Sequence, residues 1–177
     1  NYSEAWHQEA IERGLSNYGS TYEALSEYDN QKTIDILNGV LTHDEIRARK
    51  NIFKEHYEQT AQLEGRTALS LFTQYIVPAC TAYLHHLCQT KQDLKETGIT
   101  SSAALFAQTI GRIDENLATA HTHASKLEEV LSTYEASPMP LVIKEELMHL
   151  RKAVDALEKI VSHHRWPLPT YDQLLHS

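Results

Sequence analysis

A seven-residue apolar repeat is the feature that most restricts how this chain of 177 residues can fold. Its members alternate spacings of four and three: Phe106, Ile110, Ile113, Leu117, Ala120, Ala124, Leu127, Leu131 and Tyr134. Such spacing places every member on one side of an α-helix. The repeat therefore predicts a helix over residues 101–135 whose apolar stripe packs against neighbouring helices.

A second repeat with the same spacing follows after a short break. Its members are Ile143, Leu147, Leu150, Val154, Leu157, Val161 and His164. Ser137 and Pro138 precede it and supply a residue suited to the N-cap and a proline suited to the first turn. We expect a helix over residues 138–164.

A third long helix is expected upstream, over residues 42–97. Thr42 and Glu45 have the spacing of a capping box, in which each side chain accepts a hydrogen bond from a free backbone N–H of the first turn. Thr97-Gly98 is typical of a helix end. Pro78 removes one helical hydrogen bond and clashes with the preceding turn, so a kink is expected near Gln74 to Pro78.

These patterns predict an all-α fold, a long antiparallel bundle of three helices. A helix of about 35 residues is about 50 Å long, so a connection of a few residues cannot carry the chain back to its start. No alternating polar and apolar run with turn residues predicts a strand. We expect a single helical domain over residues 1–177.

The two ends of the chain lack the repeats. Residues 1–40 predict short helices, one capped by Ser3 and ended at Arg13-Gly14 and another capped by Thr21, with a break near Asp29-Asn30. Residues 165–177 predict an extended tail, because each proline forces its predecessor out of helical geometry. Thr170 is positioned to cap a last turn through Leu174-Leu175.

Several apolar side chains in these ends need a surface to pack on. We expect them to form a docking surface on the bundle or on another chain. Its candidate residues are Trp6, Trp166, Leu168, Tyr171, Leu174 and Leu175.

The charge distribution argues against two classes of partner. The formal charge is −8, and residues 1–40 carry 7 acids and 2 bases. No segment has an excess of bases, whereas nucleic-acid binding and membrane-surface binding both need clustered Lys and Arg. We expect neither a nucleic acid nor a membrane as partner.

Cysteine content and the absence of targeting signals indicate a cytoplasmic protein. Cys80 and Cys88 lie eight residues apart in one helical pattern, too far to form a disulfide, and suit a reducing compartment. No run of 18 apolar residues and no secretory signal occurs. The chain begins at Asn1, so we expect it to be part of a longer protein.

Eleven histidines suggest two alternative functions. Glu4-x-x-His7 and Glu146-x-x-His149 match the spacing of di-iron helical bundles, but the repeat directs His149 to solvent and further partner glutamates are not evident. His123, followed by Lys126, is faintly similar to the phosphorylated histidine of phosphotransfer bundles. A solvated helical face explains both patterns better, although a free-standing signalling or adaptor bundle using His123 stays as the alternative function.

No residue stands out as catalytic, cofactor-binding or metal-binding. The sequence contains no Gly-x-Ser-x-Gly, phosphate-binding loop, paired Cys motif or His-Glu-x-x-His. Gly65 and Gly111 lie singly in helical patterns and suggest close helix packing. The residues alone predict a helical bundle without a visible active site.

Five stretches of the chain give a family resemblance. They are Tyr2-Ser3-x-x-Trp6 continued through Arg13-Gly14-Leu15, Gly39-Val40-Leu41-Thr42, Glu64-Gly65-Arg66-Thr67-Ala68, Ile76-Val77-Pro78-Ala79, and Trp166-Pro167-Leu168-Pro169-Thr170-Tyr171 followed by Leu174-Leu175. The chain resembles the C-terminal domain of type III glutamine synthetase. Gly65 departs from the alanine that is usual in the family.

The resemblance implies a non-catalytic role within an enzyme. The parent would be an ATP-dependent glutamate–ammonia ligase that uses magnesium and assembles as a homo-oligomer of hexamers. Its catalytic machinery would lie in an upstream domain, so no cofactor is expected in this chain. The implied partners are the parent's own catalytic domain and neighbouring subunits, which the helical bundle would brace.

Overall fold

A computed structural model describes residues 3–99, 101–169 and 171–175, without the side chains of residues 171 and 172. The described residues form helices and connections and contain no strand, so the all-α prediction is confirmed. The chain divides into two compact units, residues 1–59 and 60–177, which we describe separately.

Unit 1 consists of short helices and the first part of a long one. Its elements are α1 (Glu4–Glu12), α2 (Thr21–Ala24), the 3-10 helix η1 (Leu25–Glu27), α3 (Gln31–Leu37) and the start of α4 (His43–Leu71). Ser3 caps α1 as predicted, but Ser20 rather than Thr21 caps α2. Ser20 lies one residue earlier and accepts the hydrogen bond of the Glu23 backbone N–H.

The capping box at the start of α4 is confirmed. The backbone N–H of Thr42 donates to Glu45 Oε2 at 2.7 Å, and the Glu45 backbone N–H donates to Thr42 Oγ1 at 3.3 Å. The first of these bonds, and then the bond that the Thr42 hydroxyl donates to Glu45 Oε2 at 2.8 Å, hold the pKa of Glu45 below its ordinary value, because they stabilise the carboxylate.

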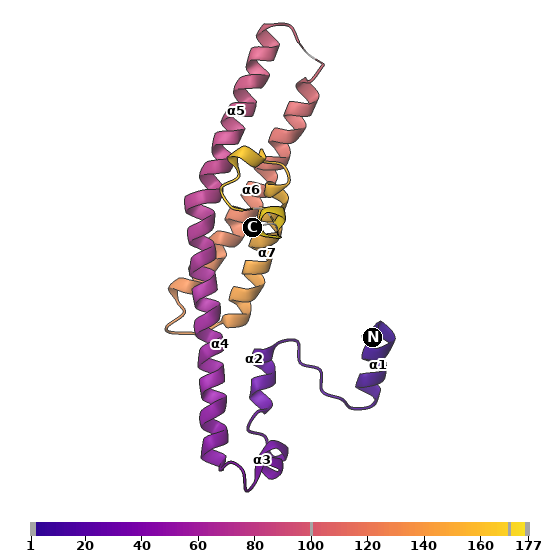
Figure 1. The fold of residues 1–177 in the computed structure, drawn as a ribbon, viewed down its shortest axis with the longest axis vertical. Coiled ribbons are helices and arrows are strands. Elements are labelled where there is room, and N and C mark those ends of the chain that lie inside the picture. The colour runs from indigo at the N-terminus through magenta and orange to yellow at the C-terminus, as the bar shows by residue number, and fades with distance from the viewer. Residues whose placement is uncertain (1–2, 100, 170, 176–177) are drawn as a thin grey trace. The chain divides into compact units, whose positions relative to one another are not determined.

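Unit 2 contains the rest of α4 and the predicted helices. Its further elements are a π-helical segment η2 (Phe72–Ile76), α5 (Val77–Glu96), α6 (Ala103–Ser132), α7 (Pro140–Glu158), the 3-10 helix η3 (His163–Arg165) and α8 (Tyr171–Leu175). Figure 1 shows α6 running beside α5, and α7 returning along α6. The predicted antiparallel packing of the long helices is confirmed.

The predicted irregularity before Pro78 takes the form of a π-helical turn. The backbone N–H of Val77 donates to the carbonyl of Phe72, five residues earlier instead of four. The helix then restarts as α5 with Pro78 in its first turn, where a residue without an N–H is tolerated. A wide turn is a known way for a helix to accommodate a proline.

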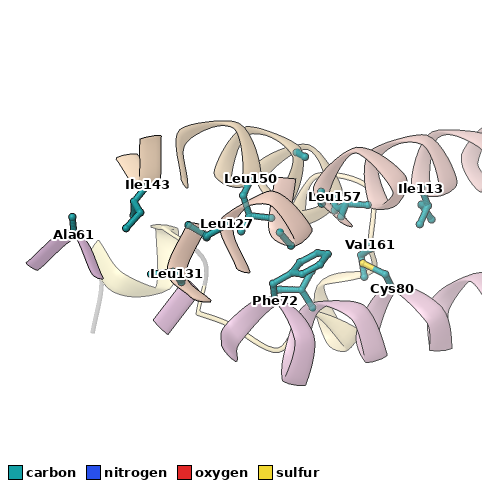
Figure 2. Packing of buried hydrophobic residues seen from close by; sticks show 14 of the residues in the cluster. Ala61, Phe72, Cys80, Ile113, Leu127, Leu131, Ile143, Leu150, Leu157 and Val161 are labelled. Carbon is teal, nitrogen blue, oxygen red and sulfur yellow. The ribbon is translucent and has the colours of Figure 1, made fainter. Parts of the chain in front are cut away.

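The core of unit 2 is built from the two repeats and from one face of α4 and α5. Figure 2 shows the side chains of Leu127, Ile143 and Leu150 in this cluster, together with Phe72 of η2 and Cys80 of α5. Ile113, Leu127, Ile143 and Leu157 are completely buried. Their burial confirms that the repeats mark the packed faces.

Gly65 and Gly111 differ in their surroundings. A Cβ added to Gly65 would lie 3.2 Å from Leu131 Cδ1 and 3.3 Å from Ile143 Cγ2, so the predicted close packing is confirmed there. A Cβ added to Gly111 would meet nothing within 4 Å. The prediction was therefore wrong for Gly111, whose position in α6 has open space beside it.

The last long helix is shorter than predicted. It spans 140–158 instead of 138–164, and Met139, not Ser137, occupies the N-cap position. Pro140 takes the first-turn place assigned to Pro138, because a second proline two residues later suits the same position. His164, predicted to face the core, is exposed in η3.

Candidate functional site

The predicted docking residues belong to several elements of the two units. Trp166 and Leu168 are partly buried and pack on the core of unit 2. Leu174 and Leu175, in α8, are 58% and 79% exposed. Trp6 belongs to α1 in unit 1, where the Arg13 guanidinium lies 5.9 Å from its ring centroid. The side chain of Tyr171 and the capping role of Thr170 lie outside the described residues.

An apolar groove lies where α4, η2 and α7 meet, with a volume of about 550 Å³. Its apolar lining includes Phe72, Leu147, Val154 and Leu168, so a residue of the predicted docking tail forms part of the wall. The ion pair between Lys144 and Glu64 stands at its polar edge. The groove therefore leaves apolar surface of unit 2 only partly covered.

The sequence did not identify this groove. Leu71 and Met148 also line it and are 37% and 63% exposed. Neither residue belongs to the repeats that predict α6 and α7. Their absence from these repeats was the only sequence signal that could have marked them as exposed apolar residues. A gap between two helix faces depends on how the helices pack. The spacing of apolar residues along one helix does not reveal that packing.

The two histidine patterns meet between α6 and α7. His123 Nδ1 lies 2.6 Å from Glu146 Oε2, and the His123 ring stacks on that of His149 with centroids 4.8 Å apart. The His123 side chain is 20% exposed, so it is more buried than the solvated helical face that the sequence predicted. His149, at 43%, keeps the partial exposure that the repeat predicted.

This cluster is built for a polar contact between helices. The two rings are inclined by only 16°, so their nitrogen lone pairs lie in nearly parallel planes and do not converge on one point. Within residues 3–99, 101–169 and 171–175, no group of three His, Cys, Asp or Glu side chains is arranged to hold a metal ion. The carboxylate of Glu146 instead links His123 with Lys126, whose Nζ lies 3.9 Å away.

The two cysteines lie in contrasting environments on α5. Cys80 is completely buried, and burial raises the pKa of its thiol to about 11, which keeps it protonated at neutral pH. Cys88 is exposed, and both cysteines are free. Cys80 therefore acts as a core residue.

The helices of the described residues differ from membrane-spanning segments in length and apolar character taken together. None of them combines the length and the apolar character needed to cross a bilayer.

Comparison with known proteins gives one consistent family. The family described as Glutamine synthetase C-terminal domain matches residues 1–95. A glutamine synthetase of Bacteroides fragilis is 28% identical over 98% of this chain and 26% of its own length. A type-3 glutamine synthetase of Dictyostelium discoideum is 26% identical, again over 98% of this chain and 26% of the relative.

A third relative supports the same conclusion. A glutamine synthetase of Butyrivibrio fibrisolvens is 24% identical over 99% of this chain and 27% of its own length. The chain thus spans about a quarter of the length of the curated relatives it matches. The family resemblance predicted from the sequence is confirmed, and this all-helical chain belongs to the glutamine synthetase C-terminal domain family.

Proposed function

We propose that the chain is the non-catalytic helical domain of a type III glutamine synthetase and that it braces the catalytic domain and neighbouring subunits. The observation that carries this proposal is the placement of apolar surface outside the core. Leu168 of the tail lines the groove of unit 2. The exposed leucines of α8 follow it in the same tail. Surfaces of this kind mark contacts with other protein.

The parent enzyme would make glutamine from glutamate, ammonia and ATP, with magnesium as cofactor. Support comes from the names of three relatives that each cover nearly the whole chain. The two units would act together as one functional domain. Two free cysteines suit a cytoplasmic enzyme, because a reducing compartment keeps thiols unpaired.

Truncation of the tail in the full-length enzyme tests the bracing role. Deleting residues 166–177 removes Trp166 and Leu168 from the core surface together with α8. We expect smaller assemblies by light scattering and lower glutamine synthesis. Unchanged assembly, stability and activity would show that the tail has no docking role.

A milder variant separates docking from folding. Leu174→Ser with Leu175→Ser changes two exposed side chains, and Leu105→Ser, at a residue of α6 that is 63% exposed, is the matched control. We expect the double variant alone to weaken assembly, while both proteins keep the helical circular dichroism of the parent. Equal assembly in the two variants contradicts the proposal.

Nucleotide binding tests the non-catalytic assignment. Calorimetry of the 177-residue chain with ATP and magnesium should give no binding heat, whereas the full-length enzyme binds the nucleotide. Micromolar binding by the chain alone would contradict the assignment.

A further inference from the structure

A basic hollow lies on the face formed by α6 and α7, beside the apolar groove, with which it shares Met148 and Arg151. Its volume is about 500 Å³. Its charged lining residues are Arg112, Arg151, Lys152, Lys159 and Asp155. Four cations against one carboxylate leave a surplus of three positive charges.

This concentration of charge is produced by the fold. Residues 98–136 carry 5 acids and 2 bases, and residues 137–177 carry 5 of each, so neither segment is basic. Lys152 and Asp155 share one face of α7, Lys159 follows at its C-cap, and Arg112 is added from α6. The ion pair between Arg151 and Asp155, with nitrogen and oxygen 3.7 Å apart, uses the only acid of the lining.

A hollow of this kind favours an acidic protein segment that also carries apolar side chains. Met148 and Ala156 give the lining an apolar part beside its cations. Met148 is 63% exposed, so an apolar side chain entering the hollow would cover it. On a chain with a formal charge of −8, such a positive surface attracts the acidic parts of other copies.

Helix α1 has the matching properties. It carries Glu4, Glu9 and Glu12, and of these Glu9 is paired with Arg13. None of its nine residues is buried, and Ile11 is 61% exposed. An isolated helix of this length is only marginally formed in water, so a surface that accepts its apolar and acidic side chains stabilises it.

We propose that the basic hollow of one copy binds the acidic helix α1 of a second copy. This inference rests on the proposed function, in which the domain contacts neighbouring subunits, and it names the two surfaces of one such contact. Glu4 and Glu12 pair with Lys152, Lys159 and Arg112, while Ile11 covers Met148. Every copy offers both surfaces, so the contact forms a reciprocal pair, a closed ring or an open filament, depending on the rotation that relates two copies.

Charge reversal on the two surfaces tests the contact in the 177-residue chain. Lys152→Glu with Lys159→Glu makes the hollow acidic, and Lys91→Glu with Lys95→Glu on α5 is the control with the same change of charge. Mass is measured by light scattering over a range of concentrations, with reductant present because Cys88 is exposed. The expected result is association of the parent and the control, and at least tenfold weaker association of the hollow variant.

Mixing experiments distinguish a second copy from other occupants. Glu4→Lys with Glu12→Lys makes α1 basic, so this protein and the hollow variant should each stay monomeric alone. Their mixture should associate, because each protein then carries the surface that complements the other. Raising salt from about 50 to about 500 mM should weaken the parent's association, since screening acts on exposed charges.

Three outcomes overturn the proposal. They are a parent chain that stays monomeric at every concentration at low salt, a hollow variant that associates as strongly as the control, and a mixture that remains monomeric. The first result is the one expected if α1 binds within its own chain or if another acidic protein fills the hollow. Because none of these variants touches the tail, the outcome is independent of the truncation experiment on the full-length enzyme.

Discussion

The two units of this chain are stabilised in different ways. Among the described residues of unit 1, the buried apolar side chains are Leu25 and Ile46. Polar and aromatic contacts connect its helices. Lys50 Nζ lies 2.7 Å from Asp29 Oδ1, and the Tyr22 hydroxyl donates to Glu58 Oε1 at 2.6 Å. Tyr28 packs edge-on against Phe53 with ring centroids 5.6 Å apart.

Unit 2 has a continuous apolar core. It extends from Ala61 to Val161 and contains most of the buried apolar side chains among the described residues, whereas Leu25 and Ile46 lie in unit 1. Burial of apolar surface is the largest favourable contribution to folding, whereas exposed polar contacts contribute little each. The comparison teaches that helical content alone does not measure stability, since both units are helical.

Amide hydrogen exchange should show the largest difference between the units. We expect the amides of α1 to α3 to exchange at least about 100-fold faster than those in the middle of α6, because local opening is easiest where few apolar contacts must break. Mass spectrometry of peptic fragments measures this. Equal protection in the two units would break the comparison.

Truncation of a core side chain should give the next largest effect. Leu127→Ala removes a completely buried side chain of α6, and we expect it to lower the free energy of unfolding of unit 2 by about 3 kcal/mol. Leu105→Ala, at an exposed position of the same helix, should change it by less than about 0.5 kcal/mol. Urea unfolding followed by circular dichroism provides the measurement.

The same truncation in unit 1 sharpens the contrast. Ile46→Ala also removes a completely buried side chain, but its effect should be confined to unit 1. Exchange rates of amides in α7 should remain those of the parent. Faster exchange there would mean that the two units unfold cooperatively.

Substitutions at Gly65 and Gly111 of unit 2 should change the free energy of unfolding in opposite directions. Gly65→Val should destabilise the protein by about 2 kcal/mol, because the added atoms meet Leu127, Leu131 and Ile143. Gly111→Ala should stabilise it by up to about 1 kcal/mol, because alanine favours the helix and has open space. Thermal unfolding of both variants measures the two signs, and a stabilised Gly65→Val protein would contradict the packing.

The smallest effect should be the acid sensitivity of unit 1. The hydrogen bond from Lys50, and then the positive charges of Lys50 and Arg47, hold the pKa of Asp29 below its ordinary value of 3.8. Stability from this group is therefore present above pH 3.8 and is lost as the pH falls towards the lower pKa of the folded state.

Replacement of Asp29 isolates this contribution. Asp29→Asn should remove part of the acid-induced loss of helix in unit 1, while Asp35→Asn, an exposed acid of α3, serves as control. NMR spectra of unit 1 residues recorded between about pH 5 and pH 2 follow the loss. Identical pH profiles for the parent and Asp29→Asn would show that the pair with Lys50 does not stabilise the unit.

Much of unit 2 could be predicted from the sequence, because its signals are periodic. Ile113, Ala120, Leu127 and Leu157 were assigned to the core by spacing alone and are buried. The ends were harder, since two prolines, Pro138 and Pro140, offered the same local start, and only packing selects between them. The exposure of His164 followed from the early end of α7.

The surfaces could not be predicted to the same degree. Arg112 lies 39 residues or more from the other cations of the hollow in the sequence. A count of charges along the chain therefore does not show that these side chains line one surface. His123 and Glu146 come from different helices, and no local sequence pattern marks the contact between the carboxylate and the imidazole. Both features depend on how α6 and α7 are rotated against each other.

The π-helical turn at Phe72–Ile76 determines the direction in which the side chains of the following helix, α5, point. An α-helix turns by about 100° per residue, so one additional residue in a turn rotates the downstream side chains by that angle. Cys80 and Leu87 point inward only after this offset. A sequence that lost one residue of the segment would turn these side chains towards water, which makes the length of this stretch as constrained as its composition.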